Sequence, residues 1–216
     1  MHLFIIAGHG AGDPGATGNG YTEAERVRAL ASRIGALGGS NVTIADTSRN
    51  WYADNGISKL SIPKDYQIIE LHMDSALASA RGGHVIINGK YKADQYDNAL
   101  AKMISAIFPG RSQIVVGRTD LANPKRAAAK GYPYRLMECG FITNANDVKT
   151  FNARMDDIAR GILQAFGLSA VGTSTSTKTE TAGKIYRVQV DAFKSKTNAE
   201  KLVSELKSKG YQAIII

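Results

Sequence analysis

Short apolar runs alternate with longer segments of helical spacing along the first 168 residues of the chain. Each run has the length of a β-strand, and most are rich in Val and Ile. The runs lie at residues 2–7, 42–46, 66–71, 84–88, 113–117 and 133–138. Helix-like segments lie near residues 22–36, 94–108 and 145–166. This alternation predicts an α/β fold in which helices cover a central, mostly parallel or mixed sheet of about six strands.

Capping residues mark the ends of two of these helices. Thr22 stands where the first would begin, and Glu25 follows it at the spacing of a capping box. Asn144 precedes the last helix, and Gly167 follows it at a position suited to a helix C-cap. The sequence therefore predicts where the first helix starts and where the last one starts and ends.

The pattern changes after residue 168. Residues 169–183 have no hydrophobic periodicity and are rich in Ser, Thr and Gly, which is typical of a linker. The sequence thus predicts a large domain at 1–168, a linker at 169–183 and a small β-α-β unit at 184–216. The elements expected in the unit are a strand at 185–192, a helix at 197–209 and a strand at 211–216. A unit of about 33 residues is smaller than most domains that fold alone, so we expect it to be truncated.

Composition narrows the functional classes. Apolar residues make up 44% of the 216 residues, enough for a packed core, and the net charge is +8. This charge suits an anionic partner, but without a dense basic run or an aromatic stacking motif we expect no nucleic-acid binding. Cys139 is the single cysteine, which excludes a disulfide and a four-cysteine metal site. The apolar run at 3–7 is too short for a signal peptide or a membrane span, so we expect neither.

Four residues with metal-binding or proton-transfer chemistry stand near the ends of predicted strands. His9 follows the first strand, His72 follows the third, and Glu138 ends the last. Glu23 opens the helix after the glycine-rich loop that carries His9. If the strands are parallel, all four converge beyond the carboxyl ends of the strands, where α/β proteins form their sites. Three such ligands would suit a zinc hydrolase, and a partly buried Glu138 would suit its general base.

Two other carboxylates compete with Glu23 for the role of ligand. Glu25 lies two residues further along the same predicted helix. Glu70 lies two residues before His72, so the alternation of side chains along a strand does not exclude it. Residue spacing alone leaves these alternatives open.

Other candidate chemistries fit the sequence less well. Cys139 follows Glu138 directly and should face the opposite side of the strand, so we interpret it as a small buried hydrophobic residue. We interpret His2 and His84 as structural. The loop GHGAGDPG lacks the Lys-Ser/Thr pair of a phosphate-binding loop and the glycine spacing of a dinucleotide-binding turn.

Three segments of the chain are GHGAGDPGATGNGYTE, ELHMDSA and ECGFITNANDVK, in this order. They resemble the motifs of the zinc-dependent N-acetylmuramoyl-L-alanine amidases of the amidase 3 type, and the resemblance covers residues 1 to about 168. It implies that His9, Glu23 and His72 bind Zn²⁺ and that Glu138 is the catalytic carboxylate. It also favours Glu23 over Glu25.

The implied reaction is hydrolysis of the amide bond between N-acetylmuramic acid and L-alanine, by a zinc-activated water with Glu138 as the general base. The implied partner is peptidoglycan, through its glycan strand and stem peptide. The chain departs from the family pattern at Asp74, where Asn is common, and Asp74 is a candidate for orienting the site. The alternative functions are a non-catalytic peptidoglycan-binding protein and a zinc amidohydrolase or peptidase acting on another amide.

The segment YRVQVDAFKSKTNAEKLVSELKSKGYQAIII belongs to the small unit. It resembles the first half of a SPOR domain, a repeat that binds glycan strands stripped of peptide. Both resemblances imply action at the bacterial cell wall. Because no signal peptide is seen, we expect an endolysin-like protein that is cytoplasmic before release, or one exported by another route.

Overall fold

The computed structural model describes residues 1–171 and 195–208. By its internal contacts the chain divides into two compact units, Met1–Ser174 and Thr175–Ile216. The first unit holds the three resembling motifs. The second holds the segment that resembles a SPOR domain.

A mixed six-stranded sheet forms the centre of the first unit, with the strand order β4-β1-β5-β8-β6-β7. Its strands are β1 (Leu3–Ala7), β4 (Val42–Ile44), β5 (Gln67–Asp74), β6 (His84–Asn88), β7 (Val115–Arg118) and β8 (Tyr134–Phe141). Strands β4, β1, β5 and β8 run parallel, whereas β6 is antiparallel to β8 and parallel to β7. The short strands β2 (Thr17–Gly18) and β3 (Tyr21–Thr22) form a separate antiparallel ribbon. This sheet confirms the predicted fold class.

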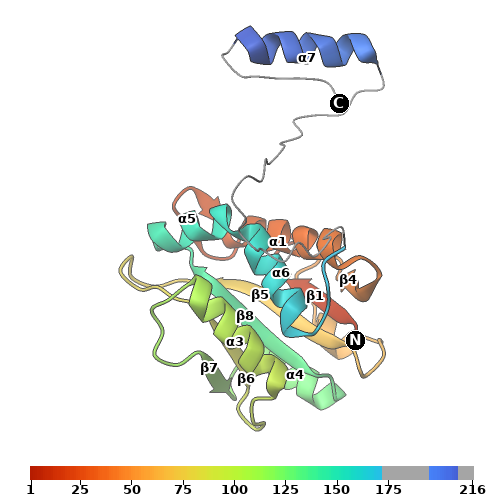
Figure 1. Ribbon diagram of the computed structural model, residues 1–216. Helices are drawn as coiled ribbons and strands as arrows, with labels where there is room; N and C mark the ends of the chain where they lie inside the picture. Colours follow the sequence, from red (N-terminus) through yellow and green to blue (C-terminus); the bar gives the residue numbers. More distant parts are fainter. Residues whose placement is uncertain (172–194, 209–216) are drawn as a thin grey trace, which may run out of the picture. The chain divides into compact units, whose positions relative to one another are not determined.

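Helices cover both faces of this sheet (Figure 1). One face carries α1 (Glu23–Gly38), α3 (Gln95–Ile107), α5 (Ala145–Ala153) and α6 (Met155–Ala165), with α6 between α1 and α3. The other carries α2 (Gly56–Lys59) and α4 (Ala122–Lys130). The 3₁₀ helix η1 (Gly39–Asn41) follows α1. Leu30, Ile104 and Ile162 are fully buried on the first face, and Trp51 and Ile57 are buried on the second.

The predicted capping residues are confirmed. The Thr22 hydroxyl accepts a hydrogen bond from the Glu25 backbone N–H at 3.2 Å, and α1 begins at Glu23. The Asn144 side chain accepts hydrogen bonds from two backbone N–H groups in the first turn of α5. Gly167 follows Phe166, the C-cap of α6, and has a φ of +70°, the left-handed conformation in which glycine commonly ends a helix.

The helices of the first unit differ from the sequence prediction in three places. The segment predicted as one helix at 145–166 is two, because the chain leaves helical geometry at Arg154 between α5 and α6. Asp156 and Asp157 favour a new helix start there, since acidic residues stabilise the first turn. The short helices α2 and α4 were not predicted. Helix α4 tolerates Pro124 in its first turn, where the missing N–H costs little.

The described part of the second unit is the helix α7 (Lys196–Ser208). It corresponds to the helix predicted at 197–209. Its less exposed side chains are Ala199, Leu202, Val203 and Leu206, which are spaced along one helix face. The strands predicted at 185–192 and 211–216 lie outside the described residues, as does most of the linker predicted at 169–183. Within the described residues, no helix has the length and apolar character needed to cross a bilayer.

Candidate metal centre

The loop after β1 holds His9 in an unusual backbone conformation. All five residues of β1 are buried, and beyond Gly8 the chain turns through His9, whose φ is +63°. A left-handed conformation is costly for a residue with a side chain, so neighbouring contacts must maintain it. The guanidinium of Arg28, on α1, provides two of them by donating to the backbone carbonyls of Gly8 at 3.3 Å and His9 at 3.0 Å. Helix α1 therefore fixes the position of His9.

Glu23 is the first residue of α1 and is only 3% exposed. Its Oε1 accepts a hydrogen bond from the backbone N–H of Met73 at 3.0 Å, and its Oε2 accepts one from Ala16 at 3.1 Å. The same oxygens lie 2.8 Å from His72 Nδ1 and 3.0 Å from His9 Nε2. Burial alone would raise the pKa of Glu23, but the hydrogen bonds to His72 and His9 lower it well below its ordinary value. Glu23 is therefore a buried anion.

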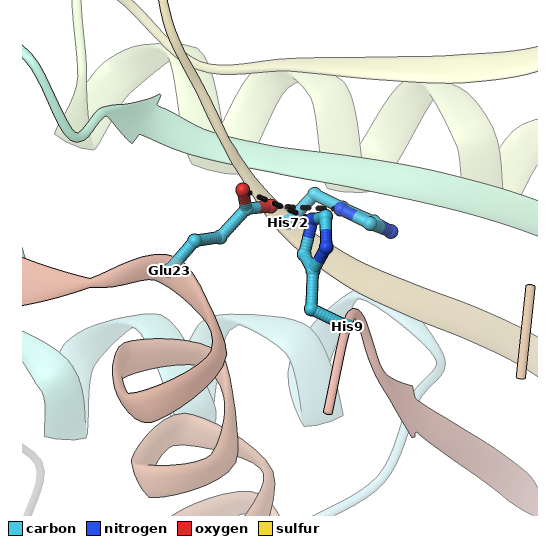
Figure 2. A group of neighbouring side chains, drawn as sticks. All are labelled: His9, Glu23 and His72. Carbon is cyan, nitrogen blue, oxygen red and sulfur yellow. Dashed lines mark hydrogen bonds and ion pairs between the residues drawn. The ribbon is translucent and has the colours of Figure 1, made fainter. Parts of the chain in front are cut away.

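Figure 2 shows His9, Glu23 and His72 pointing toward one another from the loop after β1, the start of α1 and strand β5. One ligand atom from each residue lies within 4.8 Å of the others. Two imidazole nitrogens and one carboxylate oxygen at this spacing form a donor set that zinc hydrolases use, with a fourth position left for water. These residues fit a zinc ion.

The second nitrogen of each imidazole also faces a carboxylate. His9 Nδ1 lies 2.9 Å from Asp13 Oδ2, and Asp13 accepts further hydrogen bonds from the Gly15 backbone and the Asn50 side chain. His72 Nε2 lies 3.0 Å from Glu70 Oε1. Histidines that bind metals usually donate their other N–H in this way, which fixes the ring and its tautomer. The contacts around the rings thus support the same fit.

Glu138 is the neighbour of His72 across the parallel pair β5 and β8. Its Oε2 is enclosed and has no hydrogen-bond partner among the residues that the structure describes. Burial raises the pKa of Glu138 to about 8, and the negative charge of Asp74 adds to this shift while the nearby His72 opposes it. A carboxylate with a pKa near the working pH is suited to accept and return a proton.

A family described as N-acetylmuramoyl-L-alanine amidase matches residues 3–167, well over half of the chain. The chain belongs to the N-acetylmuramoyl-L-alanine amidase family. The SPOR domain matches residues 157–216, so its match overlaps the end of the amidase match within α6. The resemblances inferred from the motifs are confirmed.

Curated relatives of this amidase domain come from several bacteria. "Probable autolysin PH" of Staphylococcus aureus (strain NCTC 8325 / PS 47) is 31% identical over 206 residues, which cover 84% of this chain and 41% of that protein. The "Sporulation-specific N-acetylmuramoyl-L-alanine amidase" of Bacillus subtilis (strain 168) is 27% identical, and the match covers all of this chain and 84% of that protein. The chain thus spans less than half of the first protein and most of the second.

Solved amidase structures have the same fold as the first unit. The CwlD amidase from Clostridioides difficile aligns with a TM-score of 0.60 and 16% identity, over 77% of this chain and 96% of that one. The catalytic domain of the CD27L endolysin aligns with a TM-score of 0.57 and 16% identity, over 76% of this chain and 96% of that one. These structures support the fold, and family membership supports hydrolysis of the peptidoglycan amide.

The structure separates the competing carboxylates of the amidase site. Glu25 is exposed and pairs with Arg26, away from the imidazoles. Glu70 lies beside His72, but at the opposite edge of the ring from Glu23. Asp74 pairs with Arg111 instead of contacting a member of the ligand set. Among these four carboxylates, only Glu23 contacts both imidazoles.

The remaining sequence candidates lie around the site or apart from it. Cys139 is fully buried in the core on the face of β8 opposite Glu138, and burial raises the pKa of its thiol. His84 is the cross-strand neighbour of Glu138 on β6, and burial lowers its pKa to about 4, so the ring is neutral. His2 stacks on Tyr66 and contacts the Thr43 hydroxyl, apart from the site.

Sequence reasoning missed the residues that support the ligands. Asp13 had a usable signal, because it follows His9 by four residues within the glycine-rich loop. Arg28 had no such signal, since an arginine on a helix is ordinarily exposed. Its role depends on contacts with backbone carbonyls that are distant in sequence. Asn123 and Tyr134, which contact Glu70, come from elements whose proximity only the fold reveals.

Gly8 leaves the space that the His72 ring occupies. A Cβ at Gly8 would lie 2.4 Å from Cε1 of His72 and within 2.8 Å of both ring nitrogens. We expect Gly8→Ala to displace the ring, weaken zinc binding by tenfold or more, and lower activity about 100-fold, since a shift of about 1 Å at a site has this effect. Titration of metal-free protein with zinc and a competing dye measures the first effect.

Gly161→Ala is the matched control for this substitution. A Cβ at Gly161 would meet the side chain of Met103 at 2.7 Å, and that flexible side chain is able to move. We expect this variant to bind zinc as the unmodified protein does. Unchanged zinc affinity in Gly8→Ala would show that the ring does not need its observed position.

Proposed function

We propose that this chain is a zinc-dependent amidase in which His9, Glu23 and His72 hold the metal and Glu138 is the general base. The observation that carries the proposal is the convergence of one ligand atom from each of the three residues within 4.8 Å. Beside them lies the enclosed Oε2 of Glu138, which has no hydrogen-bond partner within residues 1–171 and 195–208. The bond cut is the amide between the lactyl group of N-acetylmuramic acid and L-alanine.

A zinc ion in this donor set would polarise the scissile carbonyl and lower the pKa of a water molecule to about 7. The protein's own residues supply the remaining chemistry. Glu138 accepts the proton of the attacking water and then returns it to the leaving amine nitrogen of L-alanine. Two proton transfers by one residue need a carboxyl with a pKa near neutrality, and burial gives Glu138 a pKa of about 8.

The surroundings keep the site in one geometry. The Arg28 clamp on the His9 loop and the two backbone N–H groups that bind Glu23 hold two of the three proposed ligands. These contacts come from the protein itself, so the protein holds the proposed ligands in place. Such preorganisation lowers the cost of reaching the transition state.

The SPOR match at the end of the chain also supports peptidoglycan as the substrate. The SPOR domain is a peptidoglycan-binding module, and its match extends over residues 157–216. We propose that it holds the enzyme on the glycan strand while the first unit releases the stem peptide. The net charge of +8 favours attraction to an anionic cell wall.

The decisive experiment identifies the cleaved bond and the metal together. Purified protein is incubated with isolated peptidoglycan, and the products are identified by mass spectrometry. We expect glycan strands whose N-acetylmuramic acid carries a free lactyl carboxyl group, and stem peptides that begin with L-alanine. Chelation is expected to abolish the reaction, and zinc to restore it.

The two alternative functions give different products. A non-catalytic binding protein would bind peptidoglycan without releasing peptide. A hydrolase of another amide would release fragments in which the link between sugar and L-alanine is intact. Either result would contradict the proposal.

A further inference from the structure

Glu70 is a buried acidic residue that the proposed mechanism does not use. It lies in the middle of β5, is 3% exposed, and is two residues before His72, so both side chains lie on the same face of the strand. An acidic side chain is rarely enclosed unless its charge is paired and its oxygens are hydrogen-bonded.

Hydrogen-bond donors surround the Glu70 carboxylate. Asn123 Nδ2 lies 3.0 Å from Oε1 and 2.9 Å from Oε2, and the Tyr134 hydroxyl donates to Oε2 at 2.6 Å. His72 Nε2 lies 3.0 Å from Oε1. Both oxygens therefore accept, and the carboxylate has no contact that requires it to donate.

The orientation of the Asn123 amide is itself determined. Arg126, one helical turn further along α4, donates to Asn123 Oδ1 at 2.7 Å. Since a guanidinium only donates, Oδ1 must face Arg126 and the amide NH₂ must face Glu70. Helix α4 thus places the amide NH₂ of Asn123, in a fixed orientation, against the Glu70 carboxylate on β5.

The two nitrogens of His72 face different carboxylates. Nδ1 lies 2.8 Å from Glu23 Oε1, on the side of the proposed metal, and Nε2 faces Glu70 on the opposite side. With a metal ion on the Glu23 side, the neutral imidazole would carry its one hydrogen on Nε2, where Glu70 accepts it. The lone pair of Nδ1 is then directed toward Glu23 and His9.

We propose that Glu70 is a positioning residue that fixes the tautomer and ring angle of His72 for metal binding, with Asn123 and Tyr134 holding the carboxylate in place. This inference rests on the metal site of the proposed function. Glu70 acts through His72 and contacts neither the metal nor the substrate. Carboxylate partners of this kind contribute about 10–100-fold to metal affinity or activity.

The first test is the zinc affinity of Glu70→Gln. The substitution keeps the volume of the side chain, but its NH₂ group must face the NH₂ group of Asn123, because that group contacts both carboxylate oxygens. We expect the zinc dissociation constant to rise about 10–100-fold, measured by competition with a chelating dye. An affinity within twofold of the unmodified protein would overturn the proposal.

A pair of tyrosine substitutions tests the proposal if Glu70→Gln does not fold. Tyr134→Phe removes one hydrogen bond from the carboxylate. Tyr132→Phe removes an equally buried hydroxyl that donates to the Leu60 carbonyl, away from the site. We expect similar losses of thermal stability in both, but weaker zinc binding only in Tyr134→Phe. Equal zinc affinities would overturn the proposal.

Nitrogen NMR of the histidine rings gives a direct readout. In zinc-loaded protein we expect His72 to carry its hydrogen on Nε2 and to bind through Nδ1. The reverse assignment would contradict the role of Glu70. These measurements do not depend on turnover: protein that binds zinc but releases no peptide would refute the proposed function, while the effect of Glu70 on zinc affinity would still be measured.

Discussion

Replacing Glu138 with glutamine is expected to lower kcat by about 10²–10⁴-fold, the usual contribution of a general base. Glutamine has nearly the same shape but cannot accept the proton of the attacking water. Because Glu138 belongs to β8 and not to the donor set of His9, Glu23 and His72, zinc affinity should be retained. Peptide release from labelled peptidoglycan measures the first effect, and the zinc content after dialysis measures the second.

Stability provides an independent check on this variant. Burial raises the pKa of Glu138 from its ordinary value of 4.5 to about 8, so the folded protein holds a proton that the unfolded chain releases. The stability of the metal-free protein therefore falls as pH rises from about 4.5 to about 8. Glu138→Gln lacks this dependence, so it should gain stability relative to the unmodified protein over that range.

Cys139→Ala is the matched control for this prediction. Cys139 follows Glu138 directly but is buried in the core on the other face of β8. We expect this variant to keep the activity of the unmodified protein, which would exclude a thiol nucleophile. Full activity in Glu138→Gln would end the assignment of the general base.

Removing a proposed ligand should abolish both metal binding and activity. Glu23→Ala takes away the carboxylate that lies between the two imidazoles, at 2.8 Å from His72 and 3.0 Å from His9. Loss of a direct ligand costs more than loss of an outer partner, for which about 10–100-fold is typical, so we expect zinc affinity to fall by more than 100-fold. His9→Ala and His72→Ala should behave alike.

Glu25→Ala distinguishes a ligand effect from a general effect on helix α1. Glu25 lies on the same helix, is exposed, and pairs with Arg26. We expect it to keep zinc and activity, because exposed ion pairs contribute little to stability. Circular dichroism of each variant establishes that the fold is intact. Zinc binding by folded Glu23→Ala with unmodified affinity would refute the assigned donor set.

Much of the fold and of the proposed metal site could be predicted from the sequence, because both depend on patterns that are local in the chain. Strands with buried Ile and Leu are recognisable from a few residues, and His9 lies in the loop just after β1. His72 lies near the carboxyl end of β5, which continues to Asp74, whereas the sequence prediction ended this strand at residue 71. Once β1, β5 and β8 run parallel, their carboxyl ends must meet, and with them these histidines and Glu138. The choice of Glu23 over Glu25 came only from the family resemblance.

The support around the site could not be predicted, because it depends on contacts between distant segments. Helix α4 is short, with few buried residues and a proline in its first turn, so its sequence does not stand out from a loop. Asn123 contacts Glu70 across 53 residues of sequence, and Tyr134 contacts it across 64. The break at Arg154 was missed because no glycine or proline marks it.

Helix α1 links binding of the proposed metal to the folded state of the protein. Its first residue is Glu23, and one turn later Arg28 secures the loop of His9, so two of the three proposed ligands depend on a single helical segment. Unwinding of that segment would disperse the donor set, and an ion bound there would oppose the unwinding by thermodynamic linkage. In a zinc-poor environment the enzyme would thus become both inactive and easier for proteases to open at this segment, which couples its lifetime to the supply of metal.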